Sequence, residues 1–158
     1  MLESIEETKA LIREQKPSRK FAGLFEAMIC LYRAEVLRLS SSRSPDWATQ
    51  SDKLLCDSYG LFREARISYH APRALIARGR LHLDAKASGQ LIDGMNINPT
   101  IILRHAESFC SRFTLRVYLL QCYILLLESG ETRTETKLPL RSSIDAMRND
   151  GMRLRHEP

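Results

Sequence analysis

Apolar residues recur every three or four positions along this chain, and they almost nowhere alternate with a period of two. This spacing places the apolar side chains of each stretch on one face of an α-helix. Prolines stand where such helices should begin, in Ser44-Pro45-Asp46, Asn98-Pro99-Thr100 and, more loosely, Ala71-Pro72. Gly130 and Gly151 fit the left-handed position that follows a helix C-terminus. The sequence therefore predicts an all-α chain.

The same signals give the bounds of the expected helices. We predict helices over about residues 18–40, 45–68, 72–85, 99–111, 114–129 and 139–150, with a short additional helix over 5–14. In the first long helix, the positions expected to face the core are Phe21, Leu24, Phe25, Met28, Tyr32 and Val36. The helix over 114–129 is apolar nearly all round, and such a helix is expected at the centre of a fold.

Composition limits the class of protein. The chain has 158 residues, 44% of them hydrophobic and 27% charged, with a net charge of +5. These values fit one globular domain over residues 1–158 and exclude a disordered or collagen-like chain. The longest apolar run, Val117 to Leu127, is too short to span a membrane, and the acidic start at Glu3 to Glu7 lacks the features of a secretory signal. We expect a soluble, cytoplasmic protein without a membrane partner.

The cysteines carry no metal or disulfide signature. Cys30, Cys56, Cys110 and Cys122 all fall in apolar helical segments, without a CxxC pair or a histidine at metal-ligand spacing. Free cysteine usually behaves as a small buried hydrophobe. We therefore predict four buried free thiols, and no metal or other cofactor.

The chain resembles itself at a regular offset. Leu61 to Ala65 aligns with Ile102 to Ala106, and a further step of nearly the same length reaches Ser142 to Ala146. The alanine that recurs at one point is what two closely crossing helices need. A period of roughly 40 residues indicates a helical hairpin repeated in tandem.

One segment adds a resemblance to a known family. Residues Tyr69 to Leu83 resemble the first helix of a tetratricopeptide-like repeat, with Gly79 and His82 at its small and aromatic-type positions. Ala106 and Cys110 match the second helix, and Arg78 stands where the family usually has Leu. The resemblance covers about residues 50–150. It implies tandem antiparallel helical hairpins in a short right-handed superhelix with a concave groove, and the alternative is a closed helical bundle.

The resemblance also implies candidate binding residues, because the first helix of each hairpin faces inward in this family. The candidates are Arg73, Arg78, Arg80, His82 and Arg116. Arginine binds carboxylates through two parallel hydrogen bonds, so the expected partner is an acidic peptide or a helix of another protein. We accordingly expect a non-catalytic interaction scaffold. The simpler interpretation is that these side chains only solvate amphipathic helices.

Other functions stay open at this point. The basic balance, with Arg141, Arg148, Arg153 and Arg155 near the C-terminus, allows nucleic-acid binding. Arg63 and His70 have the Arg-then-His spacing of helical ribonucleases of the HEPN type, although composition alone would produce about one such match. His82, Asp84 and His105 suggest a metal site that nothing else in the sequence fixes. The polar last helix fits a solvated cap, or an end that docks onto a second subunit.

Overall fold

The computed structural model describes residues 7, 19–40, 45–67, 69–92, 97–130, 142, 144 and 145. In this part of the chain the elements are α2 (Arg19–Leu39), α3 (Trp47–Glu64), α4 (Ala71–Ala87), α5 (Pro99–Arg112) and α6 (Arg116–Glu128). All of them are α-helices, so the prediction of an all-α chain is confirmed for the described residues. The helices predicted over 5–14 and 139–150 lie outside them, apart from Glu7, Ser142, Ile144 and Asp145, which are helical.

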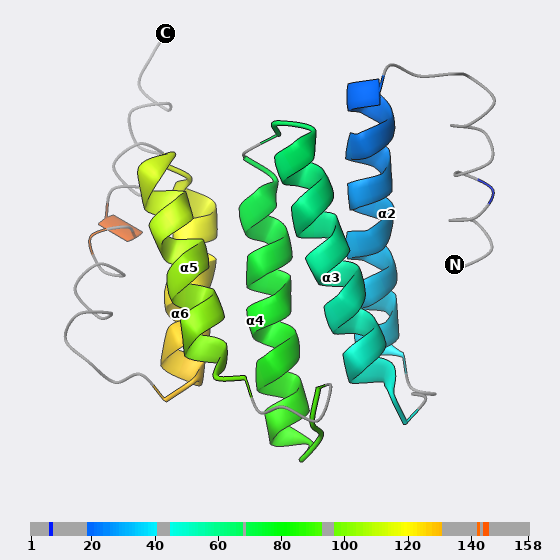
Figure 1. Ribbon diagram of the computed structural model, residues 1–158. Coiled ribbons are helices and arrows are strands. Elements are labelled where there is room, and N and C mark those ends of the chain that lie inside the picture. Colours follow the sequence, from blue (N-terminus) through cyan, green and yellow to red (C-terminus); the bar gives the residue numbers. More distant parts are fainter. Residues whose placement is uncertain are drawn as a thin grey trace, which may run out of the picture.

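The described helices run up and down beside one another in a row (Figure 1). Each packs mainly on the next helix in the sequence, and smaller contacts join α2 to α4 and α4 to α6. Of the described helices, α3 and α5 make no backbone contact, and neither do the two end helices, α2 and α6. The alternate helices α2, α4 and α6 therefore share one side of the row. The helix predicted to be central, α6, ends this row of described helices, and its Val117 is 61% exposed.

The core consists of two buried clusters that meet at α4. One fills the space between α2, α3 and α4, with Trp47, Leu55, Phe62 and Leu81 among its largest members. The other fills the space between α4, α5 and α6 and includes Leu75, Leu103 and Leu126. Burial of each large side chain contributes about 2 kcal/mol to folding. Since α4 supplies both clusters, it is the helix around which the described part is built.

The predicted core face of α2 is confirmed in part, because Leu24 and Met28 are partly buried and pack against the core. Phe21, Phe25 and Tyr32 are 58%, 42% and 48% exposed, and the buried stripe is Ala27, Leu31 and Ala34. Small residues occupy the buried face of α2 because they let α3 approach closely. Two buried serines of α3 then reach the backbone of α2: Ser58 Oγ donates to the Ala27 carbonyl over 2.8 Å, and Ser51 Oγ to that of Ala34 over 3.3 Å.

A glycine sets the contact between α4 and α5. A Cβ atom added at Gly79 would lie 2.5 Å from Cδ2 of Leu103, which is fully buried. Such a distance is far inside van der Waals contact, so only glycine fits at this crossing. The absence of a side chain at Gly79 is what lets Leu103 pack against this part of α4.

The predicted helix ends agree with the structure in part. Asn98 caps α5, since its Oδ1 accepts a hydrogen bond from the Thr100 amide over 3.0 Å, and Gly130 is left-handed with φ +89° after α6. The N-cap of α3 is Asp46, and its side chain makes no capping hydrogen bond. Pro45 therefore precedes the helix, and the predicted caps Ser44 and Gly151 lie outside the described residues.

The turn after α3 resembles the turn after α5, and Arg66 corresponds in it to Thr114. Helices α3 and α5 are both followed by a left-handed residue other than glycine, Arg66 (φ 57°) and Thr114 (φ 56°). In both turns the next amide bonds back to a buried helix residue over 2.9 Å, Ile67 to Phe62 and Leu115 to Cys110. The alignment predicted from the sequence, Leu61 to Ala65 with Ile102 to Ala106, instead pairs the C-terminal end of α3 with the first half of α5. It therefore aligns similar residue types but does not superpose these two turns.

The cysteines behave differently from one another. All four are free, but only Cys110 and Cys122 are fully buried. Cys30 is partly exposed and Cys56 is exposed, so the prediction of four buried thiols is wrong at Cys56. Cys56 lies on the exposed side of α3, where its Sγ is 3.8 Å from Asp52 Oδ2.

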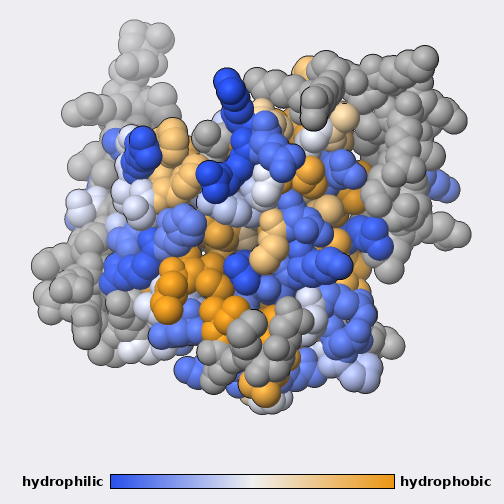
Figure 2. Space-filling view, viewed as in Figure 1, coloured by the Kyte–Doolittle hydropathy of each residue, from blue (hydrophilic) through white to orange (hydrophobic). Residues whose placement is uncertain are grey.

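Two surface observations complete the fold. None of the described helices is long and apolar enough to cross a membrane. In the view of Figure 1, α3 and α5 lie in front. The surface of this side is largely hydrophilic, and its most marked hydrophobic area lies over the lower part of α5 (Figure 2). Near that end of α5, Leu91 and Ile101 are 59% and 68% exposed.

Candidate functional site

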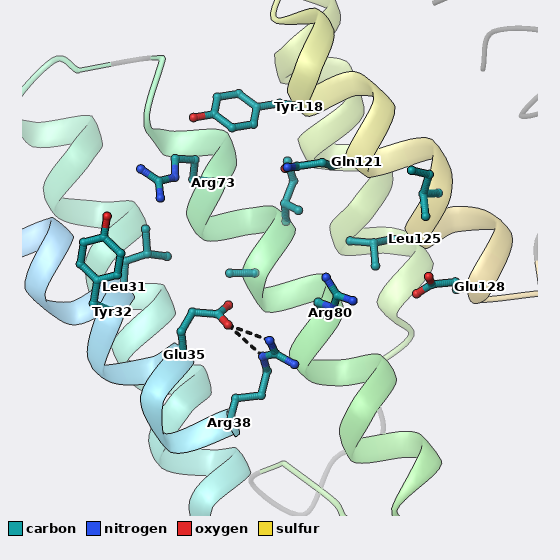
Figure 3. Close-up of a pocket in the computed structure, with 13 residues that line it drawn as sticks. Leu31, Tyr32, Glu35, Arg38, Arg73, Arg80, Tyr118, Gln121, Leu125 and Glu128 are labelled. Carbon is teal, nitrogen blue, oxygen red and sulfur yellow. Dashed lines mark hydrogen bonds and ion pairs between the residues drawn. The ribbon is translucent and has the colours of Figure 1, made fainter. Parts of the chain in front are cut away.

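A groove of about 470 Å³ lies on the side of the row that α2, α4 and α6 share. Its floor is apolar and comes from all three helices: Leu31, Ile76, Ala77 and Leu125 line it and are at least nine-tenths buried. Its walls carry the more polar and aromatic side chains Tyr32, Glu35, Arg38, Arg73, Arg80, Tyr118, Gln121 and Glu128 (Figure 3). An apolar trough with a few polar groups at its rim is the usual form of a ligand site.

The lining of α6 repeats that of α4. The positions Arg73, Ile76, Ala77 and Arg80 recur in the same order as Gln121, Ile124, Leu125 and Glu128. The step from each residue to its counterpart equals the step from Arg66 to Thr114, which relates the turns after α3 and α5. The groove is therefore lined by corresponding positions of α4 and α6, and α2 provides its third side.

Arg73 and Arg80 line the groove, as predicted for two of the five candidate residues. They lie on the same face of α4 two helical turns apart, about 10 Å along its axis. The guanidinium carbon of Arg73 lies 6.0 Å from the centre of the Tyr32 ring, and Tyr118 borders the same end of the groove (Figure 3). Arg80 is exposed nearer the opposite end.

An ion-pair network closes that opposite end between α2 and α4. Arg38 donates from Nη1 to Asp84 over 2.6 Å, and from Nε and Nη2 to Glu35 over 3.0 and 2.8 Å. Burial alone would lower the pKa of Arg38, but its hydrogen bonds to Asp84 and Glu35 raise it above its usual value. The side chain is only 13% exposed, so it holds the wall of the groove and its charge is balanced there.

Arg78 and His82, two further candidates, do not line the groove and instead contact another helix. Both bind Asp52 of α3: Arg78 Nε lies 2.7 Å from Oδ1, and His82 Nε2 lies 2.8 Å from the same atom. Burial alone would raise the pKa of Asp52, but the hydrogen bonds from His82 and Arg78 lower it to about 2. These residues join α3 to α4 inside the fold. The tetratricopeptide-like family usually has leucine at the Arg78 position. A leucine there could not neutralise the Asp52 carboxylate.

Arg116, the fifth candidate, is exposed at the first turn of α6 and is not among the residues that line the groove. The spacing of α6 explains this, since the groove face of the helix runs through Tyr118, Gln121 and Leu125. Position 116 precedes Tyr118 by two residues, roughly 200° around the helix, so it lies off that face.

Arg63 and His70, the residues of the ribonuclease hypothesis, lie on different elements. Arg63 is exposed near the end of α3, whereas His70 is the N-cap of α4 and stacks on Phe62, with ring centroids 5.5 Å apart. A turn of the chain separates the two, as the nearby Pro72 predicts. Burial and the charge of Arg73 lower the pKa of His70. Within the described residues, no group of three His, Cys, Asp or Glu side chains is arranged to hold a metal ion.

Sequence reasoning misses most of the groove. The apolar periodicity places Tyr32 in the core and Tyr118 in an all-round apolar helix, and it gives Gln121 no role. For Gln121 the signal is its correspondence with Arg73 of α4, which becomes visible only when the turns are known. Comparison with known proteins gives no further guide, because no family model, curated protein or solved structure matches this chain.

Proposed function

We propose that this protein is a non-catalytic interaction module that holds a peptide segment or a helix of a partner protein in the groove between α2, α4 and α6. The observation that carries the proposal is the lining of the groove. Three separate helices contribute a buried apolar floor, and two arginines of α4 lie at its rim. Apolar floors with polar rims are how interfaces gain both affinity and specificity.

The row of helices supports a finer proposal about the architecture. We propose that the hairpins form a short, right-handed, tetratricopeptide-like superhelix. Support comes from the missing contact between the described helices α2 and α6, and from the repeat that relates both the groove lining and the turns. In an array of this kind alternate helices share one concave side, so the groove would be the ordinary binding surface of the array.

The charges of the groove favour an acidic peptide over nucleic acid. Arg73 and Arg80 provide guanidinium groups for carboxylates, whereas Glu35 and Glu128 also line the groove. A phosphate backbone repels carboxylates along its whole length, so a nucleic-acid track is expected to be basic throughout. A peptide with separate acidic and apolar side chains meets no such conflict. Nucleic-acid binding and the ribonuclease activity stay predictions, and RNA cleavage that is lost in His70→Ala would favour the latter.

A peptide-display selection tests the proposal. The immobilised protein is used to select from a library of short random peptides, and the selected peptides are measured by fluorescence polarisation. Gln121→Trp places a large ring in the groove at an exposed position, so it should block binding without disturbing the core. We expect the selected peptides to lose at least about tenfold in affinity for this variant.

The matched control is Ser108→Trp, which adds the same ring at an exposed position of α5, outside the groove. It should leave the affinity unchanged. A second comparison uses two double variants. One carries Arg73→Glu and Arg80→Glu in the groove. Its control carries Lys53→Glu and Arg63→Glu on α3, which change the net charge of the protein by the same amount. If no peptide is selected, or if both tryptophan variants bind peptides like the wild type, the proposal is wrong.

A further inference from the structure

The two arginines of the groove have different surroundings. Arg73 lies over the Tyr32 ring at 6.0 Å and has Tyr118 beside it (Figure 3). Arg80 lies toward the end that also carries Glu35, Arg38 and Glu128. The difference suggests that the two side chains do not contribute equally to ligand choice.

The Tyr32 ring lies within cation–π reach of the Arg73 guanidinium group. Stacking on an aromatic face is a preferred arrangement for arginine, and it leaves the N–H groups at the edge of the plane free to act as a fork. None of the ion pairs between described residues involves Arg73. Its donors are therefore free of carboxylates within this part of the chain, and the Tyr32 ring lies beside the guanidinium group.

Arg80 is placed less favourably for a carboxylate. An acidic side chain that approaches it also approaches Glu35 and Glu128, which line the same end of the groove. The nearby cation Arg38 offsets only part of this repulsion, because it is shared between Glu35 and Asp84 while Glu128 lines the same end of the groove. The attraction of Arg80 for a carboxylate is thus partly cancelled. The remaining attraction is that of a charge and favours no particular orientation of the carboxylate.

We infer that Arg73 is the specificity-determining residue of the groove. Its fork takes the side-chain carboxylate of an Asp or Glu in the partner segment, and a neighbouring aliphatic side chain of that segment lies on the floor made by Ile76, Ala77 and Leu125. This inference rests on the proposed function, because it names the ligand chemistry of the same groove. Charge complementarity with Arg73 and the apolar floor beside it carry the inference.

The test uses defined peptides and two conservative variants. The probes are fluorescein-labelled decapeptides with amidated C-termini, in which one Asp or Glu is next to Leu, Ile or Val. A second set has Asn or Gln in place of the acid, and a third set has a free C-terminal carboxylate as its only acid. Affinities are measured by fluorescence polarisation for the wild type, Arg73→Lys and Arg80→Lys.

We expect the acidic–aliphatic set to bind the wild type about tenfold or more tightly than the amide set. Arg73→Lys keeps the charge but loses the planar fork and the stacking geometry, so it should remove most of this preference. Arg80→Lys should change the affinity less than about twofold, because a non-directional charge is retained.

Other outcomes separate the inference from the proposed function. If peptides bind and Gln121→Trp blocks them, but acids are not preferred or Arg80→Lys is as harmful as Arg73→Lys, the inference is wrong and the groove function stands. A preference confined to the set with a free C-terminus assigns the site to terminal carboxylates and overturns the inference in the same way. If none of the three sets binds, both the inference and the proposed function fail.

Discussion

Arg78 of α4 forms a two-point ion pair with Asp52 of α3, with Nε 2.7 Å from Oδ1 and Nη2 2.9 Å from Oδ2. The Asp52 side chain is only 8% exposed, and His82 is the second group that binds it. A buried carboxylate needs such partners, because an unpaired charge in the interior is strongly unfavourable. The arginine that sequence reasoning assigns to a ligand thus stabilises the fold.

Arg78→Ala should lower the free energy of unfolding by about 2–3 kcal/mol, because it leaves Asp52 buried with one partner fewer. Urea unfolding followed by circular dichroism measures this change. Arg80→Ala is the control on the same helix, and its exposed side chain should cost less than about 0.5 kcal/mol. Equal effects of the two variants would contradict the structural role of Arg78.

The Asp52 network also predicts a dependence of stability on pH. The folded protein holds the pKa of Asp52 at about 2, below the unfolded value of 3.8. Its contribution is therefore complete above about pH 4 and is lost as the pH falls towards 2, with a total of about 2 kcal/mol. Urea unfolding of the wild type and of Asp52→Asn between pH 2 and 6 checks this. The variant should lack this part of the acid destabilisation, and parallel curves would contradict the prediction.

Two glycines in helices should respond to alanine in opposite ways. Gly79→Ala drives a methyl group into Leu103 and should destabilise the protein by about 1–3 kcal/mol. Gly60 in α3 has no neighbour within 4 Å of an added Cβ, so Gly60→Ala should stabilise by up to about 1 kcal/mol through helix propensity. Thermal unfolding measures both changes, and a stable Gly79→Ala protein would contradict the close crossing of α4 and α5.

Thiol reactivity should follow the order of exposure. Cys56 should be the first of the four cysteines to react with a maleimide in the folded protein, and Cys110 and Cys122 should react only on unfolding. Partial burial raises the pKa of the Cys56 thiol above the usual value for cysteine. Because the thiolate is the reactive form, the labelling rate of Cys56 should keep rising to a higher pH than that of an ordinary cysteine. Mass spectrometry of the labelled protein, with Cys56→Ser as the control, identifies the site. Early labelling of Cys110 would contradict the buried α5–α6 contact.

The sequence contains enough information for the helices but not for their mutual arrangement. Periodicity and capping act within one helix, which is why α5 begins after Asn98 as predicted and Gly130 follows α6. Which apolar face is buried depends on the neighbouring helix, and α2 buries Ala27 and Ala34 in place of Phe21 and Phe25 because α3 packs closely there.

The candidate site shows the same limit. The resemblance to a tetratricopeptide-like first helix implies Arg73 and Arg80 as candidates, and both line the groove. The role of Arg78 depends on Asp52, which comes from another helix, so nothing local distinguishes Arg78 from its neighbours. Likewise Tyr32 and Tyr118 become groove residues only once α2 and α6 lie on either side of α4.

The central claim is that α2, α4 and α6 bind a segment of another protein. Amide chemical-shift mapping tests it most directly, with isotope-labelled protein titrated with the tightest peptide from the display selection. We predict that the largest shifts fall on the groove face, around Tyr32, Arg73, Ala77 and Gln121, and that they disappear in Gln121→Trp. Shifts confined to the outer faces of α3 and α5, or spread evenly over the chain, would contradict it.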